Sequence, residues 1–465
     1  MRKLILFAFC LLVVSGLACY GPERYAPTGQ PENGKIDYWI AQMKGIDPGT
    51  LSAEQREGKQ SLLTRAWQRL TAAGKPAAKR LRQELVANPD DAYFQLSAAT
   101  VLYQIEGQGA RPEVLGALKR TSMQDNSFQY FYLCHRLARS RYEAVLPVLE
   151  QTLANRKIYV FIDEDSPRLD PRAISIYLYG VFGQGSIPAL KEACTNENPI
   201  VRANAAAVLG YFGDDDPLFV LAGLLNQDAD ERVRAAAANA LGQVNHVAAI
   251  RPLRAALTND KSPSVRAACA FGLGEIQHEG CIDGLAISLN DLSPQVRQCS
   301  INSLEYIGTE RCADVVANRL AVEKDPGVRL ALTNALGFLG YDKWLPVLKR
   351  LSEESSGNEG TAAARSIKRI AGMGPRSREA YPDLEGSAVS PKKLEKILAE
   401  LYHNYGRGID QHKKSIFLSA AKDHLPQLEE LRCRVLWVVN ADSMARLGEI
   451  SKLIRLVKRK SRGMP

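Results

Sequence analysis

The sequence lacks the short motifs that usually mark an enzyme active site. Its six histidines are scattered over 465 residues. It contains no HExxH, no paired CxxC, no GxSxG and no glycine-rich phosphate loop. We therefore expect no catalytic residues, no metal site and no cofactor.

Long apolar stretches are also missing beyond the first residues of the chain. No later stretch reaches the roughly 20 apolar residues that a membrane-spanning helix needs. The start, MRKLILFAFCLLVVSGLAC, has two basic residues, an apolar run and small residues before Cys19. This pattern is typical of a secretory signal peptide, so residues 1–18 are predicted to be one.

The end of this segment, Ser-Gly-Leu-Ala-Cys at residues 15–19, resembles the lipobox of bacterial lipoproteins. The resemblance implies that Cys19 is lipidated and becomes the N-terminus. It also implies an exported protein that is lipid-anchored in a bacterial envelope, at the outer membrane or the periplasmic face. Gly16 departs from the leucine that the pattern prefers, so ordinary cleavage after Ala18 remains the alternative.

What the sequence does contain is a repeat over residues 198–340. Each of five copies has a turn with Pro or Asp, then Val-Arg and an Ala-rich run. The arginines, called the signature arginines below, are 32, 32, 31 and 32 residues apart. They are Arg202, Arg234, Arg266, Arg297 and Arg329. A fixed period in this range is the mark of a solenoid.

A second helical piece lies between the Ala-rich runs, with apolar residues at three- and four-residue spacing. One such helix pair cannot bury its apolar side alone, so the copies must stack. The repeats resemble HEAT repeats, in particular the HEAT-like repeats of the phycobilisome-lyase type. We predict an all-α fold: an α-solenoid of HEAT-like antiparallel helix pairs with a small C-terminal helical region.

Composition places the domain boundaries around this array. Residues 19–51 contain several Pro and Gly and are predicted to be a flexible tether, in which Ile36–Met43 can form one turn of helix. The solenoid is expected over residues 52–373, and the Gly-, Pro- and Ser-rich residues 374–391 are read as a linker. Residues 392–465 are expected to form a basic helical region.

Most Ala-rich runs end in Leu-Gly, and this glycine is predicted to be the left-handed residue that ends the helix. The fourth copy has Glu305 there instead, and Gly308 is expected to take over the role. The glycines concerned are Gly210, Gly242, Gly274 and Gly337.

An acidic residue precedes four of the signature arginines by six residues. An acid in the turn and an arginine in the next helix can pair within and between copies, which predicts a ladder of ion pairs. The alternative is a run of arginines that reads an anionic ligand. The acids are Asp228, Asp260, Asp291 and Glu323.

Five residues after the signature arginine, three of the five copies carry an asparagine: Asn239, Asn302 and Asn334. The resemblance to HEAT arrays places these second helices on the concave surface, where the amides would contact a protein or peptide partner. Alternatively, they cap backbone groups and hold one repeat to the next.

The nine cysteines do not indicate a disulfide framework. Cys281 and Cys312 occupy the same position of adjacent copies. Stacked helices lie about 8–10 Å apart, whereas a disulfide needs Cα atoms within about 7 Å. We expect these two, together with Cys269 and Cys299, to be small core residues.

The tail KLIRLVKRKSR at residues 452–462 places basic residues around four aliphatic ones. This pattern suits an amphipathic helix on an anionic membrane surface, and a capping helix with a solvated basic end fits it equally. Nucleic acid is not expected as a partner, because the export signal argues against it. The basic residues are Lys452, Arg455, Lys458, Arg459, Lys460 and Arg462.

These features together predict a non-enzymatic envelope lipoprotein that acts as a protein-protein interaction scaffold. The alternative is an enzyme or enzyme subunit related to the HEAT-type lyases or to deoxyhypusine hydroxylase, an oxidoreductase. By resemblance, the hydroxylase holds two irons through His-Glu pairs in its repeat helices. This chain has one such pair, His278-Glu279, which cannot supply ligands for two irons.

Overall fold

The structure, a computed structural model, describes residues 33–45, 53–121, 127–154, 171–212, 217–355 and 357–372. Over these ranges all regular structure is helical and no strand occurs, which confirms the predicted all-α fold. None of the helices found there is both long and apolar enough to cross a membrane.

The chain divides into two compact units, Met1–Gly185 and Ser186–Pro465, called unit 1 and unit 2 below. The described α-helices of unit 1 are α2 (Asn33–Ala41), α3 (Ala53–Ala73), α4 (Lys75–Ala87), α5 (Ala92–Glu106), α6 (Arg111–Arg120), α7 (Ser127–Arg139), α8 (Leu146–Ala154) and α9 (Pro171–Phe182).

Helix α5 is the centre of unit 1. It packs against α3, α4, α6 and α7, and its side chains from Phe94 to Tyr103 are all buried. A helix that is apolar on every side needs neighbours on every side. Asp91 caps its start by accepting a hydrogen bond from the backbone N–H of Phe94 at 2.9 Å.

Helix α2 corrects part of the tether prediction. It packs against α3 and α4, and Ile36, Ile40 and Met43 are at most 4% exposed. Asp37 of α2 also pairs with Arg80 of α4 at 2.7 Å. Residues 33–45 are therefore part of unit 1, because one helical face buries three large apolar side chains there.

The described α-helices of unit 2 are α10 (Ile187–Ala193), α11 (Pro199–Phe212), α12 (Leu218–Gln227), α13 (Glu231–Val244), α14 (Ile250–Asn259), α15 (Pro263–Ile276), α16 (Ile282–Ser288), α17 (Pro294–Ile307), α18 (Glu310–Leu320), α19 (Pro326–Leu339), α20 (Leu345–Glu354) and α21 (Asn358–Gly372). They form antiparallel pairs, as predicted for a HEAT-like solenoid. The last pair in the described residues is α20 and α21.

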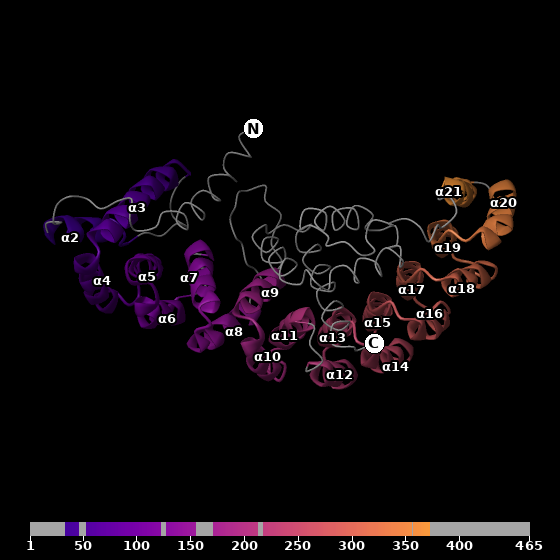
Figure 1. Cartoon of the computed structure of the whole chain (residues 1–465), viewed down its shortest axis with the longest axis horizontal. Coiled ribbons are helices and arrows are strands. Elements are labelled where there is room, and N and C mark those ends of the chain that lie inside the picture. The colour runs from indigo at the N-terminus through magenta and orange to yellow at the C-terminus, as the bar shows by residue number, and fades with distance from the viewer. Residues whose placement is uncertain are drawn as a thin grey trace, which may run out of the picture. The chain divides into compact units, whose positions relative to one another are not determined.

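The helices of unit 2 lie in two rows (Figure 1). The odd-numbered helices from α11 to α21 carry the Ala-rich runs, and each packs directly on the next. We call them the inner row, because unit 2 curves toward this side (Figure 1). The even-numbered helices from α10 to α20 form the outer row.

The inner-row helices begin and end at defined capping residues. Asp230 and Asp325 accept hydrogen bonds from the backbone N–H groups of Arg232 at 2.8 Å and of Val328 at 2.9 Å. Left-handed residues follow the last turns of four of these helices. They are Asn245, Gln277, Gly308 and Gly340. The prediction for Gly308 is thereby confirmed.

The glycines of the Leu-Gly motif do not end their helices, so that prediction was wrong. Gly242 lies inside α13, and a Cβ atom there would be 2.5 Å from the Cα of Gly272 in α15. A Cβ on Gly210 would be 2.6 Å from the Cα of Ala240. Glycine is present because the backbones of neighbouring inner-row helices touch at this position. The same holds for Gly274 against Ser303 and for Gly337 against Ser366.

Each signature arginine bonds to two successive inter-helix turns, to a carboxylate in one and to backbone oxygens in the other. Arg234 donates from Nε and Nη2 to the Asp260 carboxylate at 2.7 and 3.0 Å, and from Nη1 to the backbone oxygen of Asp228 at 3.0 Å. Burial raises the pKa of Asp260, but hydrogen bonds from Arg234 and from the Ser262 N–H bring it below its ordinary value. The other pairs are Arg202–Asp228, Arg266–Asp291, Arg297–Glu323 and Arg329–Glu359. The predicted ion-pair ladder is confirmed, and it links each copy to the next.

The cysteines of the described residues are free thiols that fill the core. Cys269, Cys281 and Cys312 are buried and Cys299 is half-buried, as predicted. Burial raises the pKa of the Cys281 thiol to about 11, so it stays protonated at neutral pH. Cys134 and Cys194 are buried in the same way.

Candidate binding surface on the inner row

The predicted asparagine column lies on the inner row, on α13, α17 and α19. Asn302 is exposed, and Asn239 and Asn334 are half-buried. The Asn302 Oδ1 accepts a hydrogen bond from Nε2 of Gln298 on the same helix at 2.9 Å. Asn239 and Asn334 have no hydrogen-bond partner within the part of the chain that the structure describes. Within the described residues these two amides therefore do not hold one repeat to the next, and ligand contact stays a prediction.

An aromatic side chain interrupts the column. Phe271 occupies the equivalent position of α15 and is 48% exposed, although it is large and apolar. Aromatic side chains at protein interfaces supply much of the binding free energy. Phe271 is therefore a candidate contact between the asparagines of α13 and α17.

A second column, nine residues after the signature arginine, was missed from the sequence. Four of its five residues are half-buried, and Glu275 is buried. Its members are Tyr211, Gln243, Glu275, Tyr306 and Phe338. In α21, Arg369 stacks on the Phe338 ring with 3.9 Å between the guanidinium carbon and the ring centroid. The constant spacing from the arginine was the signal that would have revealed this column.

Glu305 breaks the regular packing of the inner row. It occupies the place that glycine takes in the other copies, and α17 packs on α19 less extensively than other inner-row neighbours pack on each other. Burial raises the pKa of its carboxyl to about 7, against the opposing effect of Arg369. Among the described residues no side chain forms a hydrogen bond or ion pair with it.

The histidine of the single His-Glu pair has a local role in the turn after α15. The His278 Nδ1 accepts a hydrogen bond from the backbone N–H of Gly280 at 2.9 Å, and His246 does the same for Ala248 at 3.0 Å. In the described ranges, no three or more His, Cys, Asp or Glu side chains are grouped as a metal site would require. His278 and Glu279 are therefore neighbours in the sequence and do not belong to a cluster of metal ligands among the described residues.

The other predicted site residues lie outside the described residues. They are Cys19 and the basic residues Lys452, Arg455, Lys458, Arg459, Lys460 and Arg462. Their roles in lipid attachment and in contact with an anionic surface stay predictions.

Helix pairs stacked in two rows, with one row of close-packed Ala-rich helices, define this protein as an α-solenoid of the helical-repeat class. Residues 187–274, 250–337 and 282–368 match the family of HEAT repeats. The segment 187–368, which spans α10 to most of α21, therefore consists of HEAT repeats. No curated protein matches the sequence.

Several solved structures are similar to parts of this chain. Human deoxyhypusine hydroxylase in complex with glycerol is 19% identical with a TM-score of 0.25, over 59% of this chain and 96% of that one. The complex of CpcE and CpcF of phycocyanin lyase from Nostoc is 16% identical with a TM-score of 0.28, over 57% and 94%. A Kap95p structure with RanGDP is 15% identical with a TM-score of 0.42, over 89% and 60%. At these values the likeness concerns the fold and not the activity.

Proposed function

We propose that this protein is a non-enzymatic scaffold of the bacterial cell envelope that binds an extended segment of a partner protein along the inner row of unit 2. The observation that carries the proposal is a set of side chains on that row that are exposed or half-buried and bond to no other helix in the part of the chain that the structure describes. They are Asn239, Phe271 and Asn334, with Asn302 beside them. Solenoids of stacked repeats present such continuous surfaces to their partners.

The chemistry of the column suits a peptide backbone. An asparagine amide both donates and accepts hydrogen bonds, as a peptide group does. Neighbouring packed helices lie about 8–10 Å apart, which equals about three residues of an extended chain at about 3.3 Å each. Asn302 and Asn334 on α17 and α19 can thus contact peptide groups about three residues apart, while Phe271 packs against a side chain between Asn239 and Asn302.

Attachment to the membrane is the second part of the proposal and is supported by the sequence. A lipid on Cys19 anchors the chain in the envelope, at the outer membrane or the periplasmic face. A diacylglyceryl group on Cys19 brings two acyl chains, which suffice for stable anchoring. The basic residues at 452–462 then supply a second contact with anionic lipid.

The test compares two triple variants of the full chain in pull-downs from envelope extract. The inner variant is Asn239→Ala, Asn302→Ala and Asn334→Ala, and the control is Asn226→Ala, Asn259→Ala and Asn318→Ala on the outer row. Both sets remove three amides from largely accessible positions, so both should fold with nearly unchanged melting temperatures. Wild type and the control variant should recover the same partner proteins. We expect the inner variant to recover at least tenfold less of each of them. Equal recovery with all three proteins would contradict the proposal.

A further inference from the structure

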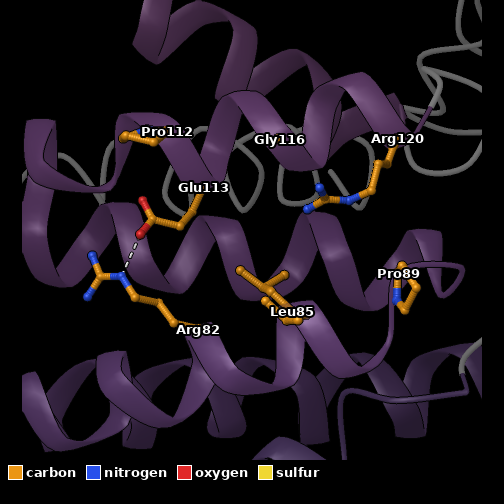
Figure 2. A pocket seen from close by; sticks show the side chains of 8 residues that line it. Arg82, Leu85, Pro89, Pro112, Glu113, Gly116 and Arg120 are labelled. Carbon is orange, nitrogen blue, oxygen red and sulfur yellow. Dashed lines mark hydrogen bonds and ion pairs between the residues drawn. The ribbon is translucent and has the colours of Figure 1, made fainter.

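Unit 1 contains a slot between α4 and α6 that the inner row of unit 2 does not involve (Figure 2). Its volume is about 550 Å³, which is within the range of ligand pockets. The apolar part of its lining comes from Leu85, Val86, Pro89 and Pro112. Val86 is 82% exposed, so a large aliphatic side chain is open to water beside the slot.

One end of the slot is closed by a neutralised arginine. Arg82 of α4 donates from Nε to Glu113 at 2.5 Å, and from Nη1 and Nη2 to Glu106 at 3.0 and 2.5 Å. Two carboxylates thus face the Arg82 guanidinium, and Lys75 also lowers the pKa of Glu106 electrostatically, so the charges at this end are balanced. Figure 2 shows the contact between Arg82 and Glu113 across the gap between the two helices.

The other end holds Arg120, which forms no ion pair with any of the described residues. Arg120 of α6 donates from Nε and Nη2 to Oε1 of Gln95 at 3.1 and 2.7 Å. Gln95 is fully buried, and its Nε2 donates to the backbone oxygens of Leu85 and Asn88 at 2.8 and 2.7 Å. Every hydrogen-bonding atom of this amide is therefore committed, and it holds the guanidinium in one orientation.

Gly116 provides the space for this arrangement. A Cβ atom at Gly116 would lie 3.3 Å from Nη1 of Arg120, so the guanidinium folds back over its own helix. Figure 2 shows it beside Gly116, over the groove that contains Leu85. No carboxylate among the described residues pairs with Arg120, although Arg82 has two. A positioned cation thus lies next to an apolar wall, and its Nη1 forms no hydrogen bond with the described residues.

We propose that this slot binds an acidic segment of a partner protein. An Asp or Glu carboxylate of that segment accepts a hydrogen bond from Nη1 of Arg120, and an adjacent aliphatic side chain packs on Leu85 and Val86. Hydrogen bonds between an arginine and a carboxylate are among the strong ones. Arg82 is already bonded to Glu106 and Glu113, so the carboxylate of the segment binds at the Arg120 end. This site does not depend on the function proposed for the inner row.

The probe is a blocked octapeptide with one Glu-Leu pair in a Gly-Ser background, titrated into the full chain by fluorescence anisotropy. We expect saturable binding that weakens at least tenfold when Glu is replaced by Gln in the peptide. Arg120→Gln is expected to weaken it at least tenfold. Lys119→Gln removes the same charge from the neighbouring position of α6, outside the slot, and is expected to change it less than about twofold.

Because Arg120→Gln also deprives the buried Gln95 of its donors, a second variant keeps the fold intact. Val86→Ser alters an exposed side chain and is expected to weaken Glu-Leu binding several-fold without changing the melting temperature. Absence of saturable binding would overturn the proposal. Equal binding of the Gln-Leu peptide or of inorganic phosphate would do the same, as would equal losses in Arg120→Gln and Lys119→Gln.

Discussion

Replacing Gly242 by alanine tests the close contact within the inner row. The added Cβ would lie 2.5 Å from the Cα of Gly272, 2.9 Å from its oxygen and 3.1 Å from its carbonyl carbon. All three atoms belong to the backbone, so no side-chain rotation relieves the overlap. Helices α13 and α15 must move apart by about 1 Å to reach ordinary contact between carbon atoms at about 3.5 Å.

The expected loss of stability follows from two opposing effects. Overpacking costs about 1–3 kcal/mol, and a clash between two backbones belongs at the upper end of that range. Alanine in place of a helical glycine returns about 1 kcal/mol through its higher helix propensity. We therefore expect Gly242→Ala to lower the free energy of unfolding by about 2 kcal/mol.

Gly223 in α12 is the matched control. A Cβ there would meet nothing within 4 Å, so Gly223→Ala should raise the free energy of unfolding by about 0.5–1 kcal/mol. Urea denaturation followed by circular dichroism measures both variants. Hydrogen exchange of the α13 and α15 amides localises the change, since repeat arrays need not unfold in one step. If Gly242→Ala were as stable as Gly223→Ala, the inferred backbone contact would be refuted.

Three further predictions concern charge and lipid attachment. Arg234→Met leaves the Asp260 carboxylate unpaired in a site where both side chains are 7% exposed. Urea denaturation should show that the free energy of unfolding falls by about 3 kcal/mol. An unchanged free energy of unfolding would show that the ion-pair ladder does not stabilise the fold. The pKa of Glu305 is raised to about 7 from 4.5, so the folded state binds more protons between these values and stability falls as pH rises. Glu305→Gln should therefore be more stable than wild type by up to about 3 kcal/mol at pH 8 and nearly equal to it near pH 4.5; a difference that does not change with pH would contradict this. When expressed in a bacterium, wild type should carry a diacylglyceryl group, measured by its intact mass, and should sediment with membranes. The Cys19→Ala variant should lack this group and stay soluble. If neither protein carried the lipid group and both partitioned in the same way, the proposed anchor would be excluded.

The regular spacing of the repeats predicts the positions of most helices in unit 2. The period of the signature arginines places the inner-row helices. The acid six residues before four of these arginines predicts the ion-pair ladder. Both features depend on contacts that recur in every copy, so the sequence displays them as regular columns. The column that contains Tyr306 and Phe338 has the same spacing but varied residue types, and for that reason it escaped notice.

The role of the Leu-Gly glycines could not be predicted from one chain read in isolation. A glycine near the end of a helical pattern fits a left-handed cap and a close helix contact equally well. The helices in fact continue to Asn245 and Gln277, which adopt positive φ values of 54° and 51° although they are not glycine. Only the distance to the backbone of the neighbouring helix distinguishes the two roles.

Unit 1 was harder to predict because its helices lack the signature. Residues 33–45 lie within a segment rich in Pro and Gly, which favours a flexible tether. The positions of Ile36, Ile40 and Met43, spaced by four and three residues, were the signal for a buried helical face. The slot beside Arg120 had no sequence signal, since Arg120, Gln95 and Gly116 come together only through the packing of α5 and α6.

The most direct test of the scaffold proposal is site-specific photo-crosslinking in a bacterium that expresses the full chain. A benzophenone amino acid replaces either Phe271 on the inner row or Phe219 on the outer row, which are 48% and 89% exposed. Both substitutions exchange one accessible aromatic residue for another. If the inner row binds the partner, we expect a discrete crosslinked partner from position 271 and none from position 219, although position 219 is more exposed. Crosslinking of the same partner from position 219 alone, or no crosslink from position 271, would contradict it.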